Sequence, residues 1–150
     1  MILRRATLGD AAAVAEVYLA ARAAGSPGVA WAHGDAEVRA WIAGFLIPRG
    51  GMTVAGEGLV VHGYIAVDGE WVDHLYVHPV SWRRGIGAGL LAHAKAASPA
   101  GLRLWTFQSN AAARAFYEHE GFVAERLTDG SDNEEREPDV LYVWPGTPNG

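Results

Sequence analysis

The sequence predicts a single α+β domain, spanning residues 1–150, whose strands form one mixed sheet. Turn residues fall between short periodic segments, as expected for a domain that combines strands and helices. Three extended runs between residues 52 and 77 are separated by short glycine-containing turns, which is typical of an antiparallel meander. A helix then leads to a further strand, and strands joined by a helical crossover run parallel.

The first third of the chain is expected to contain one strand and two helices. In order, these are a strand over 3–6, a helix from after Asp10 to about Ala24, and a helix over 35–46. Asp35 is the expected N-cap of the second helix, because its carboxylate can accept hydrogen bonds from first-turn N–H groups. Pro48 and the two following glycines are expected to end that helix.

The rest of the chain is expected to complete the sheet. The predicted elements are strands over 52–55, 59–67 and 71–77, a helix after the turn 82–87, a strand over 102–107, a helix after Asn110, and strands over 122–127 and 140–144. Asn110 is a good N-cap, and Gly121 is expected to end the last helix with a left-handed backbone.

Composition favours a globular protein without disulfides. Half of the 150 residues are hydrophobic and 19% are charged, which is enough to build one core. No apolar run reaches the ~18 residues of a membrane span, and the N-terminus lacks the pattern of a secretory signal. We therefore expect a cytoplasmic protein without a membrane partner. The absence of cysteine excludes thiolate metal sites and a cysteine-bound acyl intermediate.

The net charge of −5 is concentrated in one segment. Residues 129–139 contain six acidic residues and one arginine, and the remaining chain is formally neutral. A general nucleic-acid binder needs a basic face, so no nucleic-acid partner is expected. The acidic segment could attract a cationic substrate.

The turn 82–87 has the features of a phosphate site. Gly85 and Gly87 allow the backbone to approach an anion, and the following helix contributes unpaired N–H groups. Arg83 and Arg84 add positive charge. A dinucleotide fingerprint would need a third glycine one position later and an acidic residue ~20 positions on, and a P-loop would need Gly-Lys-Ser/Thr. Neither pattern is present.

Two sequence motifs resemble those of the GNAT superfamily of acetyltransferases. LYVHP at 75–79, the turn 82–87 and the pair Leu90-Leu91 are similar to its acyl-CoA-binding segment, and NAAARAFYEHEGF at 110–122 is similar to its second signature. LRRAT at 3–7 followed by Asp10 resembles the family's first strand and helix. The resemblance implies an α+β GNAT fold: a mixed, strongly twisted sheet of six to seven strands flanked by about four helices.

The resemblance also implies acetyl-CoA as the acyl donor, held in a gap between the strands 71–77 and 102–107. The implied cofactor-binding residues are Leu75, Tyr76, Val77, Trp82, Arg83, Arg84, Gly85, Ile86, Gly87, Ala88, Asn110, Phe116 and Tyr117. A backbone N–H near Val77 would polarise the acetyl carbonyl. Trp82 departs from the family, which usually has Gln or Arg there, and its role as a stacking or shielding group is open. N-capping alone would equally explain Asn110.

Four residues are candidates for the proton transfers. Tyr117 matches the family tyrosine that protonates the leaving thiolate, although it could also be an ordinary core aromatic. Asp73 is expected on the same strand face as Leu75 and Val77, where it could act as a base, or it could be a surface residue. Glu134 and Glu135 are competing bases in a segment that could equally be a solvated loop.

The remaining candidates concern the acceptor. Trp31, Trp41, Asn133 and Glu134 are the candidate substrate-binding residues, with core packing the alternative for the two tryptophans. The histidines His62, His74 and His78 are expected to be exposed strand residues, and no metal site is expected.

The preferred function is transfer of an acetyl group from acetyl-CoA to a primary amine, by direct attack in a ternary complex, with a small cationic molecule as the acceptor. Acetylation of a peptide or protein amine is an alternative that would require an open groove. A catalytically silent acyl-CoA-binding module is another. The sequence does not identify the acceptor, and it leaves the oligomeric state open, a homodimer included.

Overall fold

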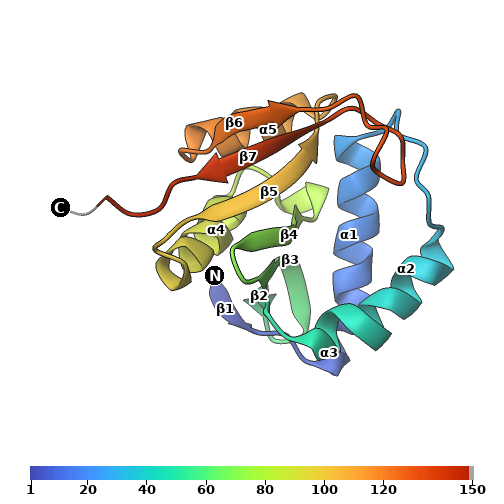
Figure 1. The fold of residues 1–150 in the computed structure, drawn as a ribbon. Coiled ribbons are helices and arrows are strands. Elements are labelled where there is room, and N and C mark those ends of the chain that lie inside the picture. Colours follow the sequence, from blue (N-terminus) through green and yellow to red (C-terminus); the bar gives the residue numbers. More distant parts are fainter. Residues whose placement is uncertain (149–150) are drawn as a thin grey trace.

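Seven strands form one sheet in the order β1-β2-β3-β4-β5-β7-β6 in the computed structural model, which describes residues 1–148 (Figure 1). The strands are β1 (Ile2–Arg5), β2 (Met52–Glu57), β3 (Val60–Asp68), β4 (Trp71–Val77), β5 (Leu102–Phe107), β6 (Val123–Leu127) and β7 (Asp139–Trp144). All neighbouring pairs are antiparallel except β4 and β5, which are parallel. The predicted mixed sheet and its parallel pair are therefore confirmed.

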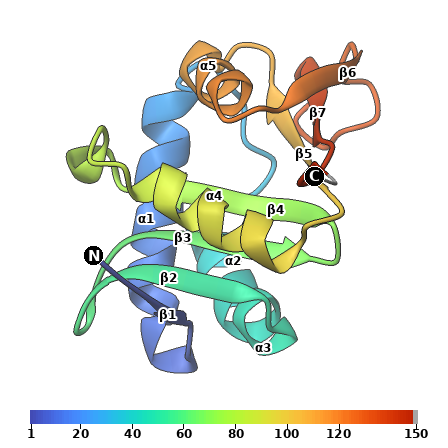
Figure 2. The same ribbon diagram turned by 90° about the vertical axis from the view of Figure 1, so that its left-hand side faces the viewer.

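The helices cover both faces of this sheet. They are α1 (Ala11–Gly25), α2 (Asp35–Trp41), the short α3 (Ile47–Arg49), α4 (Ile86–Ala97) and α5 (Ala111–His119). In Figure 2, α4 lies in front of the central strands and α1 and α2 lie behind them. Each face has its own core, the first around Leu90 and Leu91 of α4 and the second around Val14, Val17 and Ile42.

The second helix differs from its prediction at both ends. Gly34 is the N-cap and Asp35 is the first helical residue, so Asp35 contributes its charge to the first turn and not a capping hydrogen bond. The helix also continues past Leu46, through a five-residue π-turn (Ile42–Leu46), into α3. The wider π-turn accommodates the ring of Pro48, which would clash with a carbonyl in a regular α-helix.

The parallel pair β4 and β5 is joined at one end only. Its single register pair is Trp71 with Arg103, and the Arg103 N–H donates to the Glu70 carbonyl oxygen at 2.8 Å. Beyond this point β5 pairs with β7 along its whole length and diverges from β4 (Figure 1). The C-terminal ends of β4 and β5 are therefore separated, and α4 and α5 begin close to this gap.

A buried ion pair connects β1 to the start of α1. Arg4 donates from Nη1 and Nη2 to both carboxylate oxygens of Asp10, at 2.8 and 2.7 Å. The Thr7 N–H donates to the same carboxylate at 2.8 Å, and Asp10 is only 3% exposed. These hydrogen bonds, that from Arg4 foremost, lower the pKa of Asp10 to about 2.

We expect Asp10→Asn to lower the free energy of unfolding at pH 7 by about 1.5–3 kcal/mol, because a buried charged hydrogen-bond acceptor is lost. Urea denaturation measures this. The folded-state pKa is depressed, so the contribution is present above the unfolded-state pKa and disappears as the pH falls toward 2. Asp35→Asn, at a side chain that is 76% exposed, is the control and should change stability by less than ~0.5 kcal/mol. Equal losses in the two variants would contradict a role for the buried pair.

Candidate active site

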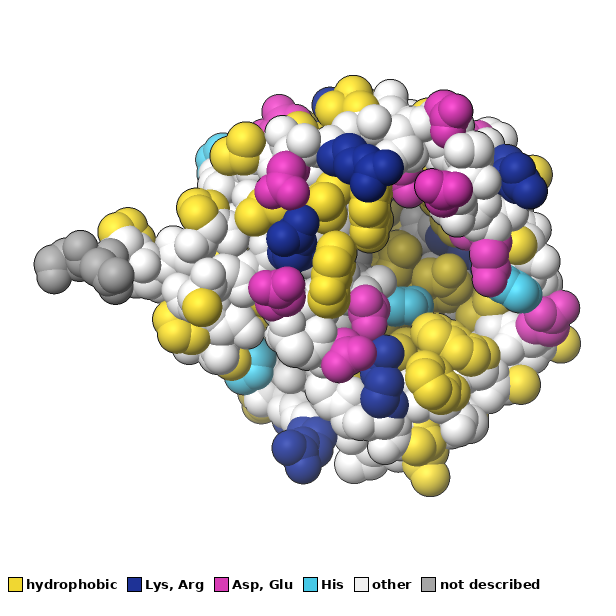
Figure 3. Space-filling view, viewed as in Figure 1, with side chains coloured by type: hydrophobic (Ala, Val, Ile, Leu, Met, Phe, Trp, Pro, Cys, Tyr) yellow, Lys and Arg dark blue, Asp and Glu magenta, His cyan; other side chains and the backbone are white. Residues whose placement is uncertain are grey.

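A cleft of about 1150 Å³ occupies the gap between β4 and β5. Its walls come from the C-terminal part of α1, the end of β4, the turn before α4, the start of α5 and the loop between β6 and β7. Figure 3 shows the hollow on the face drawn in Figure 1, with hydrophobic, acidic and basic side chains around its rim. β5 and the loop after α1 line it as well, so the cleft is built by segments that are far apart in the sequence.

The end of β4 presents backbone groups to this cleft. The His78 N–H donates to the His62 carbonyl oxygen at 2.8 Å, so His78 and His62 form a hydrogen-bonded pair. Antiparallel pairs alternate, and the register places Val77 opposite Gly63 and Leu75 opposite Ile65 in non-hydrogen-bonded pairs. The N–H and C=O groups of Val77 and Leu75 therefore face away from β3, toward the gap that β5 leaves.

The turn after β4 exposes a run of backbone donors. The first helical bond of α4 is from the Gly89 N–H to the Gly85 carbonyl oxygen, at 3.0 Å, and the N–H groups of residues 83–88 donate to no described backbone acceptor. Arg83 and Gly85 both have positive φ, 66° and 79°, which turns successive N–H groups toward one side. A left-handed non-glycine residue such as Arg83 is uncommon and often marks a functional turn. This turn can hold an anion at the helix N-terminus.

Trp82 fixes this turn to the end of β4. Its indole Nε1–H donates to the Val77 carbonyl oxygen at 2.6 Å. Neither stacking nor shielding, the two roles left open for Trp82, describes this contact, because the side chain closes the turn by a hydrogen bond. The Val77 carbonyl is thereby occupied, and the Val77 N–H is left as the polar group of this residue that faces the cleft.

The two glycines of the turn have different reasons to be glycine. Gly85 is the N-cap of α4 with left-handed backbone, where a side chain is strained. Gly87 does not have positive φ, and a Cβ placed there would lie 3.5 Å from Cζ of Phe116, an ordinary contact on the cleft wall. The turn therefore requires Gly85 for its backbone conformation. Gly87 instead leaves the cleft wall next to Phe116 without a side chain.

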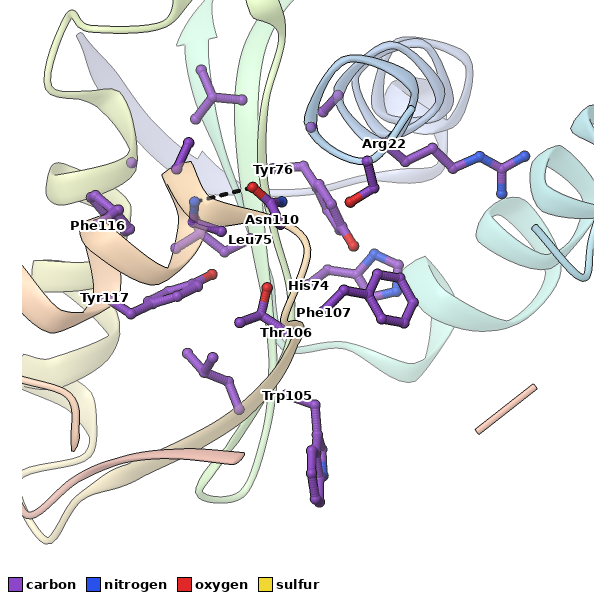
Figure 4. A pocket seen from close by; sticks show the side chains of 18 of the residues that line it. Arg22, His74, Leu75, Tyr76, Trp105, Thr106, Phe107, Asn110, Phe116 and Tyr117 are labelled. Carbon is purple, nitrogen blue, oxygen red and sulfur yellow. Dashed lines mark hydrogen bonds between the residues drawn. The ribbon is translucent and has the colours of Figure 1, made fainter. Parts of the chain in front are cut away.

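Residues of α5 line the same end of the cleft. Tyr117 is 8% exposed, its ring packs against Phe116 and Phe122, and its hydroxyl points into the cleft toward Leu75 and Thr106 (Figure 4). Burial raises the pKa of Tyr117 well above its usual value, so the hydroxyl keeps its proton. Asn110 is the N-cap of α5, as predicted: its Oδ1 accepts from the Ala113 N–H at 3.1 Å.

Asp73 does not lie where two-residue alternation predicts it. The register shifts between Ala66 and Val67 of β3, so that Val72 pairs with Val67 and His74 with Ala66, which leaves Asp73 as the extra residue of a β-bulge. Val72 consequently joins the core of Leu75, and Asp73 binds Arg49 of α3 at 3.0 Å, on the opposite side of the sheet. The predicted face is therefore wrong, because the sequence does not reveal the bulge.

The acidic loop between β6 and β7 directs one carboxylate into the cleft. Glu135 lines the cleft, and its Oε2 is buried without a hydrogen-bond partner among residues 1–148. Burial raises the pKa of Glu135, and the negative charge of Glu134 adds to this effect, whereas His33 and Arg22 lower it. Glu135 is thus a partly desolvated carboxylate that can accept a proton.

Two neighbours of Glu135 have structural contacts. The Asn133 side chain donates to the Glu137 carbonyl oxygen at 2.7 Å and accepts from the Glu137 N–H at 3.2 Å, so its amide holds the loop together. Glu134 does not line the cleft: it is exposed and hydrogen-bonds Nε2 of His33 at 2.5 Å. His33 also contacts Glu37 of α2 at 2.7 Å, and both carboxylates raise the pKa of this histidine.

The far end of the cleft contains side chains that the sequence interpretation missed. Figure 4 places Phe116 and Tyr117 at one end and Arg22, His74 and Phe107 at the other. Tyr18 and Arg22 come from α1. Their spacing of four residues puts them on the same, otherwise apolar, face of the helix, and this was the one sequence signal for a polar site there. Phe107 ends β5, and no sequence pattern distinguishes it from a core residue.

The three strand histidines are partly buried and not exposed, which corrects the prediction. His74 lines the cleft, and its Nδ1 lies 2.8 Å from the Tyr64 hydroxyl. Burial lowers the pKa of His74 to about 4, so the ring is neutral at pH 7. His62 contacts the Ser81 hydroxyl at 3.2 Å, and His78 accepts from the Val80 N–H.

Most of the predicted site residues converge on this cleft. Those that line it are Asp73, Leu75, Tyr76, Val77, Trp82, Arg83, Gly85, Ile86, Gly87, Ala88, Asn110, Phe116, Tyr117, Trp31, Asn133 and Glu135. Three do not: Arg84 is exposed beside the turn, Glu134 pairs with His33, and Trp41 stacks on His74 at 5.5 Å from outside the lining. Within residues 1–148, no group of three or more His, Asp or Glu side chains could hold a metal ion, and no helix is long and apolar enough to cross a membrane.

The fold matches many solved structures. YjaB from Escherichia coli, in its apo form, has a TM-score of 0.81 at 20% identity, covering 98% of this chain and 100% of that one. A GCN5-related N-acetyltransferase from Rhodopseudomonas palustris has a TM-score of 0.74 at 23% identity, with 96% and 94% covered. The PaiA N-acetyltransferase of Thermoplasma acidophilum, solved in complex with coenzyme A, has a TM-score of 0.71 at 18% identity, with 96% and 98% covered. No curated protein sequence gives a significant match.

The sequence itself matches the family of the acetyltransferase (GNAT) domain over residues 36–124, more than half of the chain. The fold and this match define the class of the protein as an N-acetyltransferase that uses an acyl-CoA. The chain belongs to the GNAT acetyltransferase family. The family resemblance seen in the motifs at 75–91 and 110–122 is therefore confirmed.

We expect Gly85→Ala to weaken CoA binding at least about fivefold. A non-glycine residue in left-handed backbone costs roughly 1–2 kcal/mol, and relaxation of the turn would move the N–H groups of residues 83–88. Gly58→Ala is a matched control, because Gly58 has φ of +59° in the remote turn between β2 and β3 and no atom near its added Cβ. Calorimetric titration of CoA measures both affinities, and equal values would show that the conformation of Gly85 does not matter for binding.

Proposed function

We propose that the protein transfers an acetyl group from acetyl-CoA to the primary amine of a small molecule, by direct attack in a ternary complex. The observation that carries this proposal is the arrangement of the cleft: backbone donors and a protonated tyrosine lie at one end, and the partly desolvated carboxylate of Glu135 lies near Tyr18 and Arg22, toward the other. The fit of acetyl-CoA is supported by unpaired N–H groups at the N-terminus of α4 and by a gap in the sheet.

The turn before α4 would hold the pyrophosphate of the donor. N–H groups of residues 83–88 converge there without intrahelical partners, and Arg83 and Arg84 supply positive charge. The backbone of Leu75 and Val77 faces the gap and can hydrogen-bond an extended amide-containing arm. The Val77 N–H is placed to polarise an acyl carbonyl as an oxyanion-hole donor does.

Two side chains would carry the proton transfers. Acetyl-CoA supplies the acetyl group as a thioester; when the amine nitrogen forms its bond to the acetyl carbon, the carbon–sulfur bond breaks. Tyr117 would protonate the departing sulfur, because its raised pKa keeps the hydroxyl protonated. Glu135 would accept the proton that the ammonium group of the acceptor must lose, directly or through water.

Glu135 is better placed to act as the base than Asp73 or Glu134. Asp73 lines the cleft but is paired with Arg49, and Glu134 is paired with His33 outside the cleft lining. Each of those carboxylates contacts a basic side chain, whereas Glu135 Oε2 has no partner among the described residues. Desolvation favours proton uptake by Glu135.

A small acceptor is favoured over a peptide because the acceptor end of the cleft is bridged. The contact between His33 and Glu134 joins the loop after α1 to the loop between β6 and β7, two segments 101 residues apart in the sequence. A peptide would need an open groove between such loops. A catalytically silent module is disfavoured because it would have no need for Glu135 and Tyr117 at opposite ends of one cleft.

Thiol release from acetyl-CoA with a panel of primary amines tests the function, and Tyr117→Phe tests the mechanism. We expect this variant to lose ~10²–10⁴-fold in turnover, the usual contribution of general acid catalysis, with CoA affinity within about twofold of the original. Tyr142→Phe is the control, because its hydroxyl contacts Glu118 and Arg114 outside the cleft. A loss below about threefold for Tyr117→Phe, with chemistry rate-limiting, would show that Tyr117 is only a core residue.

The acceptor kcat/KM should rise with pH through the elevated pKa of Glu135, because only the carboxylate can accept a proton. Glu135→Gln should remove this acidic limb and lower kcat/KM by about 10²-fold. Glu134→Gln carries the same charge change on the neighbouring residue and should keep the limb, with less than about a threefold effect. If Glu134→Gln removes the limb and Glu135→Gln does not, Glu134 is the base.

A further inference from the structure

Six aromatic rings, in two groups joined by the guanidinium of Arg22, line a path from the interior of the cleft to the outside. This aromatic wall consists of Phe107, Trp31, Tyr18, Tyr76, His74 and Trp41, contributed by β5, the loop after α1, α1, β4 and α2. All of them except Trp41 line the cleft. Trp41 continues the wall to the surface, where it is 42% exposed and stacks on Phe45 at 5.7 Å.

The ring contacts are close and mostly edge-on or tilted. Centroid distances are 5.6 Å for Trp31 with Phe107, 4.9 Å for Tyr18 with Tyr76, 5.2 Å for Tyr18 with His74 and 5.5 Å for His74 with Trp41. Edge-on and tilted pairs leave ring faces free to receive a further ring. The wall is therefore an aromatic surface that faces open space in the cleft.

The guanidinium of Arg22 lies between Trp31 and Tyr18, where the aromatic wall has no ring-to-ring contact. It lies 4.8 Å from the ring centroid of Trp31 and 5.4 Å from that of Tyr18. Arg22 is only 9% exposed, and its Nη2 donates to the His33 carbonyl oxygen at 3.0 Å. These contacts use the cation to hold the loop after α1 against the helix, so Arg22 positions Trp31.

His74 extends the wall as a neutral ring. It lies between Trp41 and Tyr18, and its Nδ1 contacts the Tyr64 hydroxyl, which fixes the ring plane. Burial lowers the pKa of His74 to about 4, so a ring that stacks near it at pH 7 meets no positive charge. His74 therefore adds no positive charge to that of Arg22 at this end of the cleft.

We propose that the acceptor is an arylalkylamine, a primary amine joined to an aromatic ring by a short alkyl linker, with its ring on the aromatic wall and its ammonium group at Glu135. This inference rests on the proposed function and specifies its substrate class. An aliphatic polyamine fits less well, because it has no ring to place on the aromatic wall.

The sharpest test compares two amines that differ only in aromaticity. 2-Phenylethylamine and 2-cyclohexylethylamine have the same linker and the same ring size, kcat/KM is referred to the free-amine form of each because the phenyl ring lowers the amine pKa, and 1,4-diaminobutane represents the polycationic class. We expect kcat/KM for 2-phenylethylamine to exceed that for the cyclohexyl compound at least about threefold and that for the diamine at least about thirtyfold. Equal or higher values for the diamine would overturn the arylalkylamine proposal and leave the transferase function intact.

Two variants at Trp31 test whether the aromatic wall causes the preference for the phenyl over the cyclohexyl compound. Trp31→Leu removes the ring that contacts Phe107 and Arg22, and it should reduce the phenyl-to-cyclohexyl ratio to about one. Trp31→Phe keeps an aromatic ring and should retain most of the ratio. CoA affinity reports whether each variant is folded. An unchanged ratio in folded Trp31→Leu would contradict the assignment of the wall as the binding surface.

A binding measurement separates failure of this proposal from failure of the proposed function. Ligand-observed NMR with CoA-loaded protein should show 2-phenylethylamine binding that weakens at least about threefold in Trp31→Leu. If the amine binds in this way but no amine in the panel is acetylated, the transferase function is wrong and the aromatic site stands. If amines are acetylated but 2-phenylethylamine shows neither binding nor preference, the aromatic site is wrong.

Discussion

The site depends on one constraint: β4 and β5 are paired at a single position. The Trp71–Arg103 pair holds their ends together, and it is reinforced by the Arg103 guanidinium, which lies 5.3 Å from the Trp71 ring centroid and donates to Glu125 at 3.0 Å. Beyond it, each strand bonds only to its other neighbour. A parallel pair that continued to the C-terminal ends would saturate the backbone of Val77 and close the cleft. The free donors, the gap and the two adjacent helix N-termini all follow from this divergence.

The divergence of β4 and β5 also explains how the protein keeps unpaired backbone groups available to a ligand. An unpaired backbone donor in a closed core is costly, but the same donor on a cleft wall can be solvated until a ligand replaces the solvent. The site therefore concentrates its unusual features at the cleft surface: left-handed Arg83, the bulge at Asp73 and the unpartnered Glu135 oxygen. The two cores behind it are conventionally apolar.

The fold, and the segments that line the proposed donor half of the cleft, could be predicted from the sequence, because both depend on local patterns. Strand and helix periods gave every strand of the sheet to within about two residues, and the motifs around Gly85 and Tyr117 follow each other along the chain. What failed depends on which backbone groups pair in the folded chain, and residue patterns do not reveal this. Asp73 is turned by a bulge whose cause lies in the pairing with β3, and the partner of Trp82 is a backbone oxygen five residues away.

The acceptor half was harder to predict for the same reason. Glu134 and Glu135 are neighbouring glutamates in one acidic segment, and the sequence does not distinguish them. Only the packing of the loop places Glu135 in the cleft and pairs Glu134 with His33. The aromatic wall draws on segments that are separated by up to 89 positions, from Tyr18 to Phe107, so no local spacing reveals it. A donor half carried by a local motif can stay constant while an acceptor half assembled from separate loops changes its chemistry.

The position of Tyr117 is set mainly by core packing. The C-terminal strands pair with the central sheet only between β4 and β5, and Lys95 of α4 donates a hydrogen bond to the Glu120 carbonyl oxygen at the end of α5, but Tyr117 and Phe122 belong to the same core as Leu90 and Leu91 of α4. The distance between the turn before α4 and the Tyr117 hydroxyl is therefore fixed by apolar side chains, which are close-packed and transmit small changes in volume. A cavity made at Phe122 would move Tyr117 relative to the turn before α4 without touching either. The core beneath the cleft thus sets the geometry of the chemistry that takes place above it.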